Sequence, residues 1–184
     1  MLTIQPITHI DQSVLQRLII GYETDEVYRV RKSETDAVTT IDVSLISLPQ
    51  RFVKRYGPPD SATAQRYADI AQAGHSFAAY DGDECIALAI CEVQSWNASL
   101  MIWEFHVASS HQGQGIGRRL METVAEHARS QHLRVLVCET QTTNVPAIRF
   151  YRALGFVLDG IDLSLYSNQD YPDGEIAIFM KRYL

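Results

Sequence analysis

The spacing of apolar residues is weak in the first part of the chain and becomes regular from about residue 76 onward. Near the start, Leu2–Ile7 reads as a short strand. A helix then begins after Asp11 or Ser13, either of which suits an N-cap, and its apolar residues share one face. The first part of the chain therefore predicts a strand followed by an amphipathic helix.

Residues 27–31 and 39–48 are rich in β-branched residues and partly alternate with polar ones, which favours a hairpin. Pro49 is expected to end its second arm, because proline has no N–H for a strand ladder. Residues 56–60 form a proline-rich loop, and the pattern after it predicts a helix over Ser61–Gln72 that ends near Gly74.

From residue 76 the pattern predicts a meander that leads into a crossover. Residues 76–80 and 85–93 flank an Asp-Gly turn and form the clearest hairpin of the chain, and residues 100–107 follow as a third strand. A glycine-rich loop, an amphipathic helix and the apolar run 134–138 come next. This strand, helix and strand form a βαβ unit, which makes its two strands parallel.

A second helix is predicted from Asn144, with Pro146 in its first turn and Gly155 just beyond its end. Residues 157–158, 163–166 and 176–180 complete the chain as strands. The predicted elements thus combine hairpins with one βαβ crossover.

Composition narrows the class of protein. The chain has 184 residues, 46% of them hydrophobic and 21% charged, which suits one globular domain over residues 1–184. The formal net charge of -6 argues against nucleic-acid binding and would suit a small cationic molecule or a basic peptide. Neither a membrane partner nor a membrane-spanning segment is expected, so the predicted location is the cytoplasm. Whether the protein forms a homodimer is left open.

Cys85, Cys91 and Cys138 lie within apolar runs and lack metal-ligand spacing. They are expected to be reduced and buried, with neither a disulfide nor a metal site.

The glycine-rich loop is the main chemical motif. Gln112, Gly113, Gln114, Gly115, Ile116 and Gly117 lie at a predicted helix start, where backbone amides bind anions well if no side chain blocks the approach. The loop lacks both the third glycine of a dinucleotide fold and the Gly-Lys-Ser/Thr of a P-loop. A tight strand-to-helix turn is the structural alternative, and Arg118 is either a phosphate contact or a solvated side chain.

The motifs as a set resemble the GNAT superfamily of acetyl-CoA-dependent N-acetyltransferases. They are Trp-Glu-Phe-His-Val at 103–107, Gln-Gly-Gln-Gly-Ile-Gly at 112–117, Asn-Val-Pro-Ala at 144–147 and the run 150–156. The resemblance covers roughly residues 76 to 180, the expected coenzyme-binding and catalytic core, and leaves residues 1–75 as a variable acceptor-side part. It implies an α+β fold with a mixed, mostly antiparallel sheet flanked by helices. This sheet splays between the strands 100–107 and 134–138, with acetyl-CoA in the splay.

Further positions are similar to the streptothricin acetyltransferases, which acetylate the β-lysine amine of that antibiotic. They are Glu139, Thr140, Gln141, Asn144, Ala147, Phe150, Tyr151, Gly155, Phe156, Asp162, Leu165, Tyr166, Asn168, Glu175, Ala177 and Phe179.

Glu104 is the candidate catalytic base. An alkyl ammonium, with a pKa of about 10.4, must lose a proton before its nitrogen can attack a thioester, and a carboxylate in an apolar strand is costly unless it is paired or used. On a regular strand Glu104 shares a face with His106, while Trp103, Phe105 and Val107 share the other unless a bulge intervenes. A structural salt bridge is the alternative for Glu104, and His106 is expected to be a packing residue rather than a base.

The resemblance supplies the other coenzyme-side roles. It implies Tyr151 as the proton donor to the leaving thiolate, against packing on the sheet as the alternative. It implies that Asn144 and Ala147, with the backbone of Phe105, His106 and Val107, contact the pantetheine arm. Asn144 also suits a helix cap.

A cationic acceptor needs anions and aromatic walls. Trp103, Asp162, Tyr166 and Glu175 are the candidate substrate-binding residues, with Trp96 as a further wall. Each also has a plain alternative as a solvated charge or core aromatic.

The function that follows is direct transfer of an acetyl group from acetyl-CoA to a primary amine of a small cationic substrate, such as a streptothricin-like antibiotic, in a ternary complex. A protein or peptide amine as acceptor and a non-catalytic acyl-CoA sensor are the alternatives.

Overall fold

The computed structural model describes all residues from 1 to 184, and the chain forms two compact units. The first unit comprises Met1–Ile20, Tyr56–Cys138 and Arg182–Leu184, and the second comprises Gly21–Arg55 and Glu139–Lys181. The residues predicted to bind acetyl-CoA and the acceptor, and those predicted to catalyse the transfer, are divided between the two units.

The first unit is built on a sheet in which only one pair of neighbouring strands is parallel. Its strands run in the order β1 (Leu2–Ile7), β4 (Ser76–Asp81), β5 (Glu84–Gln94), β6 (Ser99–Val107) and β7 (Val135–Gln141), of which residues 135–138 belong here. The helices are α1 (Gln12–Leu18), α2 (Ser61–Gln72) and α3 (Ile116–Ser130), with the short 3-10 helix η1 (Ser109–His111). These elements match the predicted strands and helices to within a few residues.

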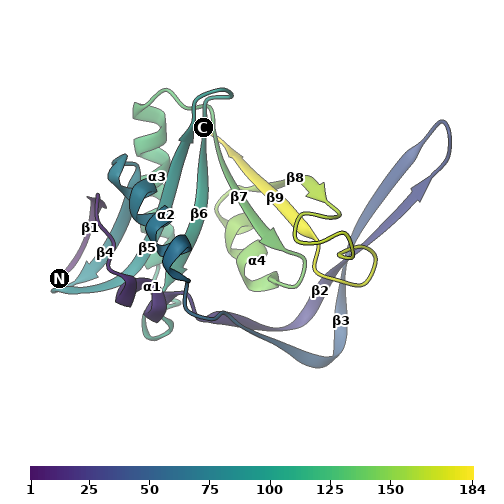
Figure 1. Ribbon diagram of the computed structural model, residues 1–184, viewed down its shortest axis with the longest axis horizontal. Helices are drawn as coiled ribbons and strands as arrows, with labels where there is room; N and C mark the ends of the chain where they lie inside the picture. The colour runs from purple at the N-terminus through teal and green to yellow at the C-terminus, as the bar shows by residue number, and fades with distance from the viewer. The chain divides into compact units, whose positions relative to one another are not determined.

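The helices of the first unit cover both faces of its sheet (Figure 1). Ala78 of β4 belongs to a buried cluster formed with residues of α1 and α2, whereas its neighbour Phe77 packs against His127 of α3, with ring centroids 5.1 Å apart. Because successive strand residues point to opposite faces, α1 and α2 lie on one face and α3 on the other.

The predicted βαβ crossover is confirmed. Residues Ser99 to Ile102 of β6 pair in parallel with Val135 to Cys138 of β7, and α3 connects the two strands. The inner face of α3 is fully buried at Leu120, Met121 and Val124. Burial of this apolar stripe anchors the start of α3, and the loop before it, on the sheet.

A bulge interrupts β6 next to Glu104. Ile90 of β5 pairs with Glu104 and Cys91 pairs with Ile102, so Trp103 is an extra residue in the ladder. A bulge of this kind turns the residues before and after it to opposite faces. Glu104 therefore faces α2, together with Ile90, and Ile102 faces α3.

The second unit contains a two-stranded ribbon and a small sheet. The ribbon consists of β2 (Gly21–Glu34) and β3 (Thr39–Arg55), and Figure 1 shows its tip extending beyond the other elements of this unit. The remaining elements are α4 (Val145–Ala153), β8 (Val157–Asp162), β9 (Ala177–Tyr183) and the end of β7, in the strand order β7, β9, β8.

The predicted hairpin 27–48 is too short, and the prediction that Pro49 ends its second arm is wrong. Strand β3 continues to Arg55. Thr24 pairs with Phe52 and Glu26 with Ser47, so residues 48–51 lie opposite Asp25 alone. Pro49 falls in this irregular stretch, where the ladder requires no N–H from it.

The predicted strand 163–166 is also wrong, because these residues form turns. The carboxylate of Asp162 accepts a hydrogen bond from the backbone N–H of Ser164, and that of buried Asp170 accepts bonds from the N–H groups of Tyr166 and Ser167. Backbone N–H groups that donate to side chains in this way cannot also donate to a neighbouring strand.

The predicted mixed, mostly antiparallel sheet flanked by helices is confirmed. The three cysteines are buried and carry free thiols. None of the helices combines the length and the apolar character needed to cross a membrane. The single domain and the splay of the sheet stay predictions.

Candidate active site

The glycine-rich loop has a backbone that only glycine adopts easily at two positions. Gly113 and Gly115 have φ values of 75° and 79°, and a Cβ atom at either position would meet nothing within 4 Å. The loop therefore faces open space, and the reason for glycine here is the left-handed backbone. The side-chain amides of Gln112 and Gln114 donate to the carbonyls of Val107, at 3.0 Å, and Ser110, at 3.2 Å.

Gly115 is the N-cap residue of α3, and the first helical hydrogen bond runs from the N–H of Arg119 to its carbonyl at 3.1 Å. The amides of Ile116 and Gly117 precede that bond, in the part of a helix that is suited to an anion. Gly117 is buried in the first turn, whereas Arg118 is exposed. The predicted anion-binding residues thus lie together on one exposed loop and helix start.

Glu104 is the centre of a hydrogen-bonded group on the α2 face of β6. The hydroxyl of Tyr67, from α2, donates to Oε1 of Glu104 at 2.5 Å, and Nε2 of His106 lies 2.6 Å from Oε2. The side chains of Glu104 and His106 are each 20% exposed. The prediction that Glu104 and His106 share a face is confirmed.

The phenol of Tyr67 is held in its protonated form. Burial raises the pKa of Tyr67, and the negative charge of Glu104 and the hydrogen bond to it raise that pKa further. Tyr67 is therefore a fixed hydrogen-bond donor to the carboxylate. Phe105 and Val107 point to the opposite face, as the alternation along β6 predicts.

Trp103 does not lie on the opposite face from Glu104, as a regular strand would place it. The bulge turns Trp103 toward the cluster formed with α1 and α2. Its indole N–H donates to Oε2 of Glu92 at 2.7 Å, and the guanidinium of Arg66 lies 4.1 Å from the centre of its ring. One face of this candidate aromatic wall thus already carries a cation.

Trp96 forms no wall of this group. It is 84% exposed in the turn between β5 and β6, at the far end of β6 from the glycine-rich loop.

In the second unit, the side chain of Asn144 caps α4 by accepting a hydrogen bond from the N–H of Ala147 at 3.3 Å. The predicted capping role is confirmed. Tyr151 is 7% exposed, and its ring centre lies 5.5 Å from that of Phe150 and 5.3 Å from that of Phe156. Its ring is packed on the inner face of α4, and its catalytic role stays a prediction.

Glu175 lies in a polar cluster of the second unit rather than beside an open cation site. Its carboxylate accepts hydrogen bonds from Lys54, from Thr143 at 2.5 Å and from Tyr22 at 3.2 Å. Burial alone would raise the pKa of Glu175, but the bonds from Lys54, Thr143 and Tyr22 together with the charge of Lys54 outweigh it and lower that pKa. The ammonium of Lys54 already balances its charge.

Asp162 and Tyr166 make hydrogen bonds with other residues of the second unit. Asp162 accepts hydrogen bonds from the backbone and hydroxyl of Ser164, whereas Tyr166 donates its hydroxyl to Glu139. Burial and this carboxylate both raise the pKa of Tyr166, so it too remains a donor. The charge of Glu175 also raises the pKa of Tyr166, so Tyr166 lies near the Glu175 cluster, whereas Asp162 bonds to Ser164.

Sequence reasoning missed several partners of the predicted residues. They are Tyr67, Arg66, Glu92, Lys54, Tyr22 and Thr143. Tyr67 is 37 positions from Glu104 in the sequence, and only the packing of α2 on β6 brings the two together. No local spacing indicates such a contact.

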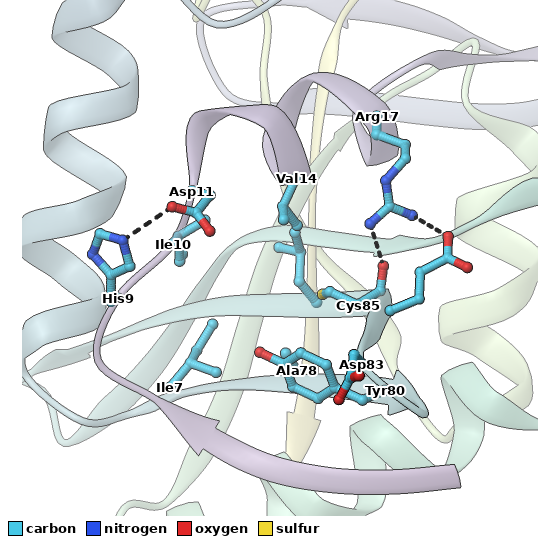
Figure 2. Close-up of a pocket in the computed structure, with 12 residues that line it drawn as sticks. Ile7, His9, Ile10, Asp11, Val14, Arg17, Ala78, Tyr80, Asp83 and Cys85 are labelled. Carbon is cyan, nitrogen blue, oxygen red and sulfur yellow. Dashed lines mark hydrogen bonds and ion pairs between the residues drawn. The ribbon is translucent and has the colours of Figure 1, made fainter. Parts of the chain in front are cut away.

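A cavity of about 200 Å³ lies elsewhere in the first unit, between α1 and the β4–β5 hairpin (Figure 2). Arg17 at its edge binds Glu84 at 2.8 Å and the carbonyl of Cys85 at 2.7 Å, and His9 binds Asp11 at 3.2 Å. None of the predicted site residues lines it. No group of three or more His, Cys, Asp or Glu side chains in the structure could hold a metal ion.

The model of the Acetyltransferase (GNAT) family matches residues 44–156, which is more than half of the chain. The chain belongs to the GNAT acetyltransferase family. The matched segment includes β6, the glycine-rich loop, α3 and α4. The predicted family is confirmed.

Among curated GNAT relatives, the streptothricin acetyltransferase of Streptomyces lavendulae is 39% identical over 100 residues, covering 54% of this chain and 52% of that protein. The chain thus spans about half the length of the curated relatives it matches. The solved structure of nourseothricin acetyltransferase has a TM-score of 0.77 and 28% identity, covering 99% of this chain and 98% of that one. A solved structure from Bacillus anthracis str. Ames, in complex with acetyl coenzyme A, has a TM-score of 0.74 and 20% identity, covering both chains fully.

Proposed function

We propose that this GNAT protein transfers an acetyl group from acetyl-CoA to a primary amine of a small cationic acceptor. The observation that carries the proposal is a single segment of the first unit, in which β6 presents the carboxylate of Glu104 and leads directly into the anion-binding start of α3. Such a segment can supply both a proton-accepting centre and a place for the coenzyme diphosphate. The solved relative that holds acetyl coenzyme A supports the choice of coenzyme.

The residues of the loop fit acetyl-CoA. Gly113 and Gly115 leave open space where side chains would begin, and the amides of Ile116 and Gly117 suit a diphosphate. Exposed Arg118 adds a positive charge in the same turn. Pantetheine contacts by the backbone of Phe105, His106 and Val107, and by Asn144 and Ala147, are proposed from the family resemblance.

Acetyl-CoA supplies a thioester whose carbonyl carbon is open to attack by an amine. The group around Glu104 takes a proton from the ammonium of the acceptor, because only the neutral amine has the lone pair that attacks. Tyr151 is proposed from the family resemblance as the donor of a proton to the departing thiolate.

Direct transfer in a ternary complex is favoured over an acetyl-cysteine step. Cys91 and Cys138 are no more than 1% exposed, and Cys85 is 7% exposed. Burial raises the pKa of Cys85 and, most strongly, that of Cys91, so neither thiol forms a thiolate nucleophile easily.

The acceptor class is proposed from the relatives and from charge. One relative is named a streptothricin acetyltransferase, and another is named a nourseothricin acetyltransferase. The net charge of -6 favours the approach of a cationic molecule. A streptothricin-like antibiotic with a free primary amine is therefore the proposed substrate.

Release of coenzyme thiol from acetyl-CoA, measured against a panel of amines, tests this function. The panel contains streptothricin, free lysine and a lysine-containing peptide, with a reaction lacking amine as the blank. We expect the highest kcat/KM with streptothricin. A preference for the peptide would replace the proposed acceptor, and tight coenzyme binding without turnover of any amine would leave an acyl-CoA sensor instead.

A further inference from the structure

Both oxygens of the Glu104 carboxylate already have a hydrogen-bonding neighbour, which changes how this group can accept a proton. We propose that His106 accepts the proton of the acceptor amine, that Glu104 orients His106, and that Tyr67 is a positioning residue that holds Glu104. This inference rests on the proposed acetyl transfer and assigns its proton acceptor.

The hydrogen-bond roles follow from the donors around Glu104. Tyr67 can only donate to Oε1, because burial and the carboxylate keep its phenol protonated. An ionised carboxylate is an acceptor only, so Nε2 of His106 must carry the hydrogen that lies between it and Oε2, 2.6 Å away. Each oxygen of the carboxylate is therefore held by one of these two bonds.

In the tautomer with hydrogen on Nε2, the Nδ1 atom of His106 keeps its lone pair. Nδ1 makes no hydrogen bond, and the imidazole is 20% exposed, so a small molecule can reach it. An orienting carboxylate on one nitrogen stabilises the imidazolium that forms when the other nitrogen takes a proton. The guanidinium of Arg66 lies over the ring of Trp103, the residue next to Glu104, and its charge acts on Tyr67.

The protons and bonds of the reaction balance with His106 in this role. The acceptor ammonium gives one proton to Nδ1 of His106, and the imidazolium later returns it to solvent. The amine nitrogen then bonds to the acetyl carbonyl carbon as the carbon–sulfur bond breaks. The second proton leaves the nitrogen for solvent. The sulfur takes a proton from Tyr151 and departs as the thiol, and Tyr151 then regains a proton from solvent. Glu104 stays ionised throughout.

The tautomer can be tested without turnover, by nitrogen NMR of the histidine rings in the free protein, with the His106 signals assigned from His106→Gln. We expect hydrogen on Nε2 and a bare Nδ1 at pH 8. Tyr67→Phe and Glu104→Gln should each shift the His106 signals, whereas His9→Gln, at an exposed histidine, should not. Hydrogen on Nδ1 in the native protein would overturn the proposal, whatever acceptor the enzyme uses.

Kinetics test the role itself, with folding of each variant confirmed by circular dichroism. We expect His106→Gln to lower kcat by about 10² to 10⁴, the usual contribution of a general base, with unchanged affinity for acetyl-CoA. His106→Ala should recover activity on addition of free imidazole, which a merely structural residue would not show. Tyr67→Phe should lower kcat by about tenfold, shift the acidic limb of the pH profile of kcat/KM and leave the KM for acetyl-CoA unchanged.

Two kinetic results would contradict the assignment. Full activity in His106→Gln together with inactive Glu104→Gln would make Glu104 itself the base. Unchanged pH profiles in Tyr67→Phe would remove its positioning role. If the wild type acetylates no amine, the proposed function fails, and the NMR measurement still decides whether the Glu104–His106 pair has the proposed tautomer.

Discussion

Trp103 and Glu104 are consecutive residues whose side chains lie on the same face of β6, because Trp103 occupies a bulge opposite β5. The bulge places an aromatic ring beside a carboxylate, which a regular strand cannot do with adjacent residues. The site on β6 therefore depends on an irregularity of the sheet as much as on the identity of its residues.

The anchoring of Trp103 predicts a loss of stability when its indole N–H is removed. Trp103→Phe leaves Glu92 without the bond now made at 2.7 Å and weakens the stacking of Arg66. We expect the free energy of unfolding to fall by about 1–3 kcal/mol in urea titrations. Trp96→Phe is the matched control, because Trp96 is 84% exposed, and its effect should stay within about 0.5 kcal/mol.

The left-handed backbone of Gly115 predicts a coenzyme-binding defect. An alanine at this φ of 79° meets no steric neighbour, so the cost lies in the backbone alone, about 1–2 kcal/mol. If binding requires this conformation, Gly115→Ala should weaken acetyl-CoA binding by about tenfold in calorimetry. Gly82→Ala, at a φ of 57° in the β4–β5 turn, has a similar strain and should bind the coenzyme normally. Equal coenzyme affinities in both variants would show that the loop does not contact it.

The cluster around Glu175 predicts a stability difference that depends on pH. The pKa of Glu175 is lowered in the folded protein, so its bonds stabilise the fold above the unfolded pKa of about 4.3 and are lost as the pH falls through the folded value. The native protein should exceed Glu175→Gln in unfolding free energy at pH 7, and the gap should close in acid. A gap that stays constant down to pH 3 would contradict the ion pair.

The pair of His127 and His75 predicts a second loss of stability in acid, which begins at a higher pH than that of Glu175. The ring of His127 lies 2.9 Å from Nδ1 of His75, and burial, followed by the charge of His75, lowers the pKa of His127. A histidine with a lowered pKa resists protonation in the fold, so stability falls as the pH drops below the unfolded pKa of about 6.5. Melting temperatures between pH 7.5 and 5.5 should fall more steeply for the native protein than for His127→Gln. Parallel curves would mean that the pair does not oppose protonation.

Most elements of the fold could be predicted from the sequence, because their patterns are local. The apolar stripe of α3, the Asp-Gly turn and the cap of α4 each follow from residues within a few positions of one another. The turns after Asp162 could not be predicted in this way. Their apolar residues resemble a strand, but the buried carboxylate of Asp170 takes the backbone donors from farther along the chain.

Part of the candidate site could also be predicted from the sequence, because it depends on residues that are close together in the chain. Glu104 and His106 are two residues apart on a strand, so their shared face follows from alternation. The contact of Tyr67 with Glu104 and the pairing of Lys54 with Glu175 join residues 37 and 121 positions apart, and they arise only when the elements pack. The sequence alone left Glu175 as a candidate for a cationic substrate, whereas a lysine of the chain binds it.

The most direct test of the proposed acetyl transfer is mass spectrometry of streptothricin incubated with the protein and acetyl-CoA. We expect a product heavier by one acetyl group, with that group on a primary amine and one coenzyme thiol released per product. Thiol release without acetylation of any amine, or acetyl groups found only on the protein itself, would contradict it.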